Sequence, residues 1–195
     1  MTPGFLEEPP ISEPMQVFYD EDVKDTGYVW NVSRLWAYQI DTKKQLFALM
    51  SQAFNTSGLN FRQRGIHVTA TASTLGDSYC SLAWGGKLAG TSDPRTAVGV
   101  LSGDDIGLTE QERAMAEWAR KVVRDPNATL PSDIEALRNV GLSDSQIFAI
   151  TTFVALRLAF STINDALGAN PDAQLLKSVP EEIVRSVTYG RRADL

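Results

Sequence analysis

Apolar residues recur along the chain at alternating four- and three-residue steps, which is the spacing of one face of an α-helix. The clearest run in the first half consists of Phe61, Gly65, Val68, Ala72 and Leu75. It predicts a helix over residues 61–75, and no alternating strand pattern of similar length competes with it. We therefore predict an all-α protein built as a compact helical bundle.

The second half carries three capping-box signals, in which a hydroxyl residue precedes an acid or amide by three positions. They are Thr109 with Glu112, Ser132 with Glu135, and Ser143 with Gln146. Matching stop signals follow each start, at Asp125-Pro126, Gly141 and Gly168. Shorter patterns predict further helices over residues 29–38, 42–55, 78–89, 94–101 and 180–187.

The helix predicted over residues 144–167 is apolar on two sides. Ala149, Phe153 and Phe160 lie on one face, and Ile150 and Val154 lie nearly opposite. A helix with two apolar faces must be covered on both. We expect a central helix, covered by other helices of the chain or by a partner subunit.

The distribution of proline and charged residues divides the chain into an arm, a domain and a tail. Residues 1–14 contain four Pro and three Glu and predict an extended N-terminal arm. Residues 15–189 form a single predicted domain, and residues 190–195 a solvated tail. A weak internal repeat pairs residues 58–90 with 141–168, because Gly58-Leu59-Asn60 and Gly141-Leu142-Ser143 each open a long helix and Gly85 and Gly168 fall at the same later offset. Chance similarity between amphipathic helices is the better explanation of this repeat.

Charge excludes two classes of partner. The 195 residues include 18 Lys and Arg against 24 Asp and Glu, a net charge of −6. A nucleic-acid binder or a protein that binds anionic membranes needs a basic surface, so we predict neither partner. The longest predominantly apolar stretch, residues 147–156, ends at Arg157, short of the roughly 20 residues that span a bilayer. We predict a cytoplasmic location.

The chain has one Cys and one His. No disulfide can form within the chain, and a classical zinc site would lack ligands. We predict neither a metal nor a cofactor.

Cys80 is the only thiol, and it follows a helix stop at Gly76 and an N-cap residue at Asp77 or Ser78. It should therefore lie in the first turn of a new helix. The helix macrodipole favours the thiolate there, whereas the neighbouring Asp77 disfavours it. The alternative is that Cys80 is a small buried packing residue.

Several short motifs at helix starts and ends accompany this thiol. Tyr79-Cys80 is followed by Gly85, and downstream the chain carries Leu108-Thr109-Glu110-Gln111-Glu112-Arg113, Arg124-Asp125-Pro126, Leu137-Arg138, Gly141-Leu142-Ser143-Asp144 and Asn164-Asp165-Ala166-Leu167-Gly168. This arrangement, from about residue 29 to 172, resembles the peroxidase-related branch of the alkylhydroperoxidase D (AhpD)-like, carboxymuconolactone decarboxylase superfamily. The resemblance implies an all-helical, obligate homo-oligomer, a dimer, trimer or hexamer.

The resemblance also implies a specific chemistry. Active members reduce hydroperoxides with a Cys-x-x-Cys pair, a His four residues after the second Cys and a Glu fifteen residues before it. Here Cys80 stands at the second Cys position, but Asp77, Trp84 and Gly65 stand at the first Cys, His and Glu positions. The motif is degenerate, and a two-cysteine peroxidase cycle is chemically impossible for this chain.

Four other residues are candidates for a supporting role. His67 belongs to a polar stripe that predicts a surface or interface position, from which it could serve Cys80 across a subunit boundary. Asp77 is either a helix N-cap or a carboxylate base. Tyr79 and Trp84, with Phe61, either line an apolar pocket for an aromatic or acyl ligand or simply pack.

Arg157 interrupts an otherwise apolar helix, with Ser161 and Asn164 on the same face. An unpaired buried guanidinium would cost several kcal/mol, so we predict that Arg157 pairs with a carboxylate at a subunit interface. Binding of an anionic substrate is the alternative.

Two functions remain open at this point. The first is a one-cysteine peroxidase or thiol antioxidant acting through Cys80 on a small hydroperoxide. The second is a non-redox protein that binds or transforms an apolar or carboxylic metabolite beside Trp84. A catalytically silent homologue fits the sequence equally, so whether the protein is an enzyme stays open.

Overall fold

Helices and short 3₁₀ turns make up the secondary structure of residues 4–192, the part of the chain that the computed structural model describes. The helices are α1 (Glu13–Thr26), α2 (Asn31–Trp36), α3 (Ile40–Ser57), α4 (Phe61–Leu75), α5 (Ser78–Thr91), α6 (Pro94–Ser102), α7 (Glu110–Arg124), α8 (Pro131–Asn139), α9 (Asp144–Ala166), α10 (Ala173–Ser178) and α11 (Glu181–Ser186). The 3₁₀ turns are Ala37–Gln39 and Pro126–Ala128. These residues contain no strand, which confirms the all-α prediction.

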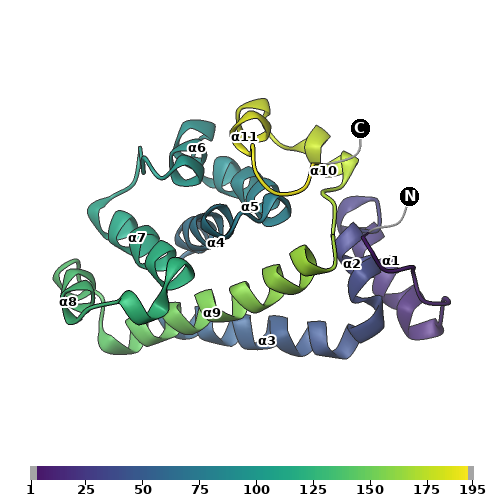
Figure 1. Ribbon diagram of the computed structural model, residues 1–195, viewed down its shortest axis with the longest axis horizontal. Coiled ribbons are helices and arrows are strands. Elements are labelled where there is room, and N and C mark those ends of the chain that lie inside the picture. Colours follow the sequence, from purple (N-terminus) through teal and green to yellow (C-terminus); the bar gives the residue numbers. More distant parts are fainter. Residues whose placement is uncertain (1–3, 193–195) are drawn as a thin grey trace.

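Figure 1 shows α3 and α9 side by side along one edge of the molecule, with α4 and α5 above them in the centre. Helix α4 packs against α5, α7 and α9, and α5 packs in turn against α6, α10 and α11. Helices α7 and α8 close one end, and α1 and α2 lie at the other (Figure 1). The predicted helix pair 61–75 and 78–89 is therefore the central layer.

Helix α9 is central, as its two apolar faces predict. Ile150 and Val154 join the core cluster that contains Met115 of α7, whereas Phe153 and Phe160 join the cluster that contains Met50 of α3. By length and mean hydropathy, α9 is long and apolar enough to cross a membrane. Its packing against α3, α4 and α7 is instead that of a core helix.

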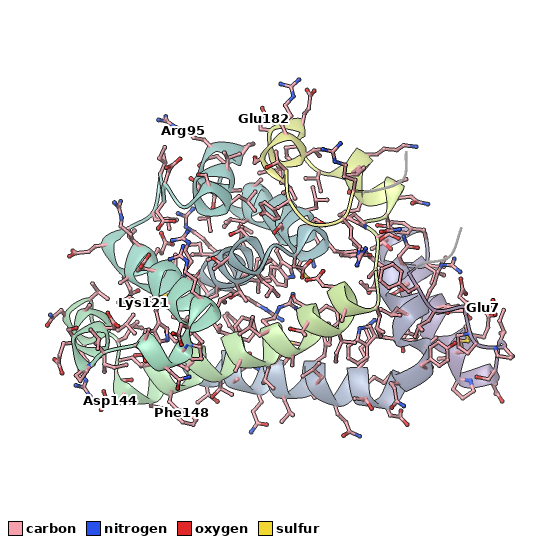
Figure 2. The ribbon with its side chains drawn as sticks, in the orientation of Figure 1. Glu7, Arg95, Lys121, Asp144, Phe148 and Glu182 are labelled. Atoms are coloured by element: carbon pink, nitrogen blue, oxygen red, sulfur yellow. The ribbon has the colours of Figure 1, made fainter. Side chains whose placement is uncertain are left out.

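Phe148 of α9 is an exception to this burial, because its side chain is 76% exposed. Figure 2 shows it projecting away from the body of the molecule.

Two of the three predicted capping boxes form. Thr109 and Ser143 accept hydrogen bonds from the amides of Glu112 and Gln146, whose side chains bond back to the cap amides. The predicted box of Ser132 with Glu135 is wrong. Helix α8 begins two residues earlier, with Leu130 as N-cap and Pro131 in the first turn, and the Asp133 carboxylate accepts a hydrogen bond from the Leu130 amide at 2.9 Å. Proline fixes the dihedral angle that a first helical residue needs, which favours this earlier start.

Helices α1 and α10 were not predicted. Helix α1 begins at Glu13, inside the predicted 1–14 arm, and ends at Gly27 with φ +85°. Residues 4–12 are irregular but attached to the bundle, because the Phe5 amide donates to the Leu167 carbonyl at 2.8 Å and Glu8 pairs with Arg34 at 2.8 Å. Residues 1–3 of the predicted arm lie outside the described residues.

The weak internal repeat is found in the structure only at the starts of the two helices. Gly58 and Gly141 both adopt positive φ, and Asn60 and Ser143 both cap the following helix through a full capping box. The likeness then ends, because Gly85 lies inside α5 whereas Gly168 follows the end of the single helix α9.

Candidate functional site

Cys80 lies in the first turn of α5, as predicted. Helix α4 ends at Leu75, and Gly76 turns the chain with φ +86°. Asp77 then caps α5, because its Oδ1 accepts a hydrogen bond from the Cys80 amide at 2.8 Å. This confirms Asp77 as an N-cap, and the same contact fixes a carboxylate next to the thiol.

The sulfur of Cys80 is buried among polar groups. Arg157 Nη2 lies 3.1 Å from Sγ, and Ser161 Oγ lies 3.8 Å from it. Cys80 is only 3% exposed. A sulfur surrounded by hydrocarbon would indicate packing alone, but here two polar side chains of α9 reach the thiol from across the helix interface.

Burial raises the pKa of the Cys80 thiol, and the charge of Asp77 raises it further, whereas Arg157 acts in the opposite direction. The sequence left open whether the macrodipole or Asp77 decides the ionisation of this thiol. The dominant influence is one that the local sequence does not contain, the desolvation of the sulfur by other helices. The resting thiol is therefore protonated at neutral pH.

Among the described residues Arg157 forms no ion pair, and the predicted pairing with a carboxylate at a subunit interface stays a prediction. Arg157 is 4% exposed, and its guanidinium contacts the Cys80 sulfur and two aromatic rings. The guanidinium carbon lies 5.2 Å from the centre of the Phe160 ring and 5.9 Å from that of Trp84. Aromatic faces and a polarisable sulfur replace the expected carboxylate, which partly offsets the cost of burying the charge.

Asp77 keeps one carboxylate oxygen without a hydrogen-bond partner. Asp77 Oδ2 is buried and unpartnered, and the residue is 0% exposed. Asp77 also affects Asp165. The pKa of Asp165 is raised to about 7, mainly by burial and to a lesser extent by the charge of Asp77. Asp165 is thus a second carboxyl group close enough to Asp77 for the two charges to interact.

His67 is completely buried in α4, so the predicted surface position is wrong. Neither ring nitrogen has a hydrogen-bond partner, and burial lowers the pKa of His67 to about 4. A polar residue at helical spacing need not face solvent, because it can bond to the backbone of its own helix. Thr71 Oγ1, for example, donates to the His67 carbonyl at 2.7 Å.

Gly65, at the position of the Glu in the resembled motif, faces α5. A side chain there would meet Leu88, whose Cβ and Cδ1 lie 3.4 Å from the Cβ position. The glycine therefore allows close packing of α4 on α5.

Tyr79 and Trp84 do not share one pocket. Tyr79 donates its hydroxyl hydrogen to the Asp172 carboxylate, and its ring lies 6.2 Å from that of Trp30. Trp84 lies on another side of α5, 5.9 Å from Phe61 between ring centres. The predicted grouping of Trp84 with Phe61 is therefore found, whereas Tyr79 belongs to a separate buried contact.

Within the predicted solvated tail, Gly190 and Arg192 are exposed, whereas Arg191 is attached to the bundle. The Arg191 carbonyl accepts a hydrogen bond from Ser78 Oγ at 2.6 Å, and its guanidinium donates to the Asp165 carbonyl at 3.1 Å. Tyr189 donates to Ser81 Oγ at 3.0 Å. The C-terminal segment thus covers the first turn of α5. Residues 193–195 of the predicted tail lie outside the described part of the chain.

Sequence reasoning missed Arg64 and Lys87 as site residues. Both approach the ring of Trp84, at 5.3 Å for the Arg64 guanidinium carbon and 4.7 Å for Lys87 Nζ. They come from α4 and α5, and no local spacing links either residue to Arg157 on α9. Within residues 4–192, no group of three or more His, Cys, Asp and Glu side chains is placed to hold a metal ion.

The arrangement around α4, α5 and α9 is the AhpD-like fold of peroxidase-related proteins. An uncharacterized peroxidase-related protein from Ralstonia eutropha JMP134 with an alkylhydroperoxidase AhpD core superposes with a TM-score of 0.79 at 23% identity, over 90% of this chain and 95% of that one. A peroxidase-related protein from Silicibacter sp. TM1040 gives 0.78 at 21% identity, over 90% and 95%.

The debrominase Bmp8 has the same fold, with a TM-score of 0.71 at 14% identity, over 88% of this chain and 92% of that one. Bmp8 has also been solved in complex with 2,3,4-tribromopyrrole. Neither a scan of protein-family models nor a search of curated proteins gives a match.

Proposed function

We propose that the protein reduces small organic hydroperoxides with a single cysteine, Cys80, assisted by Asp77 and Arg157. One observation carries the proposal. The sulfur lies 3.1 Å from the Arg157 guanidinium, beside a capping carboxylate that keeps a free buried oxygen. A packing cysteine needs neither group.

The chemistry starts from a protonated thiol. As Sγ attacks the nearer peroxide oxygen, an S–O bond forms, the O–O bond breaks and the Asp77 carboxylate accepts the thiol proton. Asp77 then returns the proton to the alkoxide that leaves. The products are Cys80 sulfenic acid and an alcohol, so the sulfur is oxidised by two electrons and the peroxide is reduced by two.

Arg157 stabilises the negative charge that develops on sulfur and oxygen during the attack. The chain has no second cysteine to form a disulfide with the sulfenic acid. An external low-molecular-weight thiol must therefore reduce Cys80, first as a mixed disulfide and then by a second thiol, with release of water.

The solved neighbours support both open functions. Two of them are peroxidase-related proteins, which favours thiol chemistry at Cys80. Bmp8 is a debrominase, and its complex with a bromopyrrole favours the alternative, a small-molecule site beside Trp84. The cytoplasmic location and the homo-oligomer stay predictions.

A coupled assay with cumene hydroperoxide and dithiothreitol tests the proposal. Cys80→Ser should abolish turnover, and Asp77→Asn should slow it about 100-fold, within the range of general acid–base catalysis. Asp93→Asn is the matched control, because Asp93 caps α6 through the Thr96 amide as Asp77 caps α5. Equal rates for the wild type and Cys80→Ser would remove the redox function and leave a binding protein or a silent homologue.

A further inference from the structure

Three cationic side chains from three helices surround one aromatic ring. The Arg64 and Arg157 guanidinium carbons and Lys87 Nζ lie 5.3, 5.9 and 4.7 Å from the centre of the Trp84 ring. Arg64 is also 5.2 Å from the Phe54 ring centre. Helices α4, α5 and α9 therefore converge on a positively charged, aromatic-lined site, which we call the Trp84 cation cluster (Arg64, Lys87, Arg157).

The Trp84 cation cluster lacks a counter-charge. Among residues 4–192, none of the ion pairs involves these three residues, although six other Arg and Lys residues are paired. Arg64 Nε and Arg157 Nε are both buried without a hydrogen-bond partner. Burial lowers the pKa of Arg64 and of Lys87, and the neighbouring cations lower it further. Arg157 is buried, Arg64 is half-buried and Lys87 is exposed. Cations gathered around one ring repel one another, and the buried charge of Arg157 is costly unless an anion neutralises it.

The donors indicate the chemistry of the missing anion. A guanidinium presents a planar fork of N–H donors that matches a carboxylate or phosphate. The surroundings distinguish these two, because the Phe54, Phe61 and Trp84 rings offer contact to an apolar body. Such walls favour a carboxylate with an attached apolar or aromatic group over inorganic phosphate.

We propose that the Trp84 cation cluster binds a small monocarboxylate whose apolar or aromatic body packs against Trp84 and Phe61. The proposal does not depend on peroxide chemistry at Cys80, because Arg64 and Lys87 have no contact with the sulfur among the described hydrogen bonds. The two proposals meet only at Arg157, which contacts both Sγ and the Trp84 ring.

Calorimetric titration with benzoate, phenylacetate and octanoate tests the site, with benzamide and inorganic phosphate as comparisons. At least one carboxylate should bind and raise Tm, and added NaCl should weaken the binding. Arg64→Met and Lys87→Met should each weaken it about 10-fold or more, the usual loss of a hydrogen bond to a charged group. Arg95→Met is the matched control, since Arg95 is exposed on α6, a helix that contributes no residue to the cluster.

The Cys80→Ser protein separates this proposal from the redox function, because it should bind the carboxylate as the wild type does. A second measurement needs no ligand. At low ionic strength Lys87→Met should raise Tm, because it removes one of three repelling charges. Three results overturn the proposal: no binding of any of the three carboxylates at 10 mM, about the weakest affinity of use for a small ligand; equal binding of benzamide; or tighter binding of phosphate than of the carboxylates.

Discussion

Cys80 lies between two side chains of opposite charge, so two substitutions should change its reactivity in opposite directions. Arg157→Met keeps the length and apolar character of the side chain but removes the guanidinium 3.1 Å from Sγ. Asp77→Asn keeps an oxygen that caps the Cys80 amide but removes the negative charge. Neither substitution changes the number of thiols.

The distance to Arg157 sets the scale of the effect. Two full charges at this separation interact by about 5 kcal/mol at an effective dielectric constant of about 20. Neighbouring charges in proteins change the ionised population of a group by about 10- to 1,000-fold. We expect Arg157→Met to slow thiolate-dependent alkylation by a factor in that range, because Arg157 opposes burial and Asp77 more strongly than the other opposing group, Ser161. Asp77→Asn should accelerate alkylation by about 10-fold.

Iodoacetamide is the suitable reagent because it is neutral and reacts with the thiolate. Its rate of reaction with Cys80 would be followed by intact mass from pH 6 to pH 10, at concentrations where the rate is proportional to reagent. Cys80→Ser gives the background, and circular dichroism with urea unfolding confirms that each variant is folded. Changes of the same sign in Arg157→Met and Asp77→Asn would refute the electrostatic description of the site.

Rates measured with a hydroperoxide and with iodoacetamide distinguish the two roles of Asp77, its charge beside the thiol and its transfer of a proton. Alkylation requires only the thiolate, so Asp77→Asn should accelerate it. Peroxide reduction also requires a proton for the leaving alkoxide, so the same variant should slow it. Acceleration of both reactions would show that Asp77 influences the thiol but carries no proton.

Three further predictions concern the rest of the molecule. Arg120→Met should lower the free energy of unfolding by about 3–5 kcal/mol, because it strands the buried Asp105 carboxylate; urea unfolding measures this, and adding Asp105→Asn should recover part of the loss. His67 has a folded pKa of about 4, below its unfolded value of 6.5, so the wild type should lose about 2 kcal/mol more than His67→Met between pH 7 and pH 5, where only the unfolded state gains the proton. Phe148→Asp should lower the mass measured by light scattering if the predicted homo-oligomer uses the exposed faces of α3 and α9, whereas an unchanged oligomer would place its interface elsewhere.

The fold was largely predictable because its signals are local. Capping residues, stop glycines and apolar spacing lie within one helix of each other, and they located α4, α5, α7 and α9 to within about two residues, the usual uncertainty of helix ends. Helix α1 was missed because four prolines near it suggested an extended arm. Pro14 is tolerated there because it lies in the first turn, where its missing N–H has no partner to lose.

The position of Cys80 and its cap were predictable for the same reason, but the environment of its sulfur was not. Arg157 is 77 residues from Cys80 in the chain, and Arg64 is 93 residues from Arg157. The desolvation argument correctly marked Arg157 as a buried charge that needs compensation. It did not find the groups within the chain that contact Arg157, a thiol and two aromatic rings, because the sequence does not say which residues lie within reach of one another.

The contacts of Arg157 within the chain have a consequence for the site. If Arg157 formed an ion pair with a carboxylate of the same chain, its charge would be neutralised and would not be available to a ligand. A thiol with a raised pKa and two aromatic faces solvate the guanidinium only partly, and Arg64 and Lys87 add further positive charge around the same ring. Partial compensation stabilises the bundle less than an ion pair would, but it keeps the charge available. An anion that enters, whether a peroxide in the course of reduction or a carboxylate at rest, then gains interactions that the chain itself leaves incomplete.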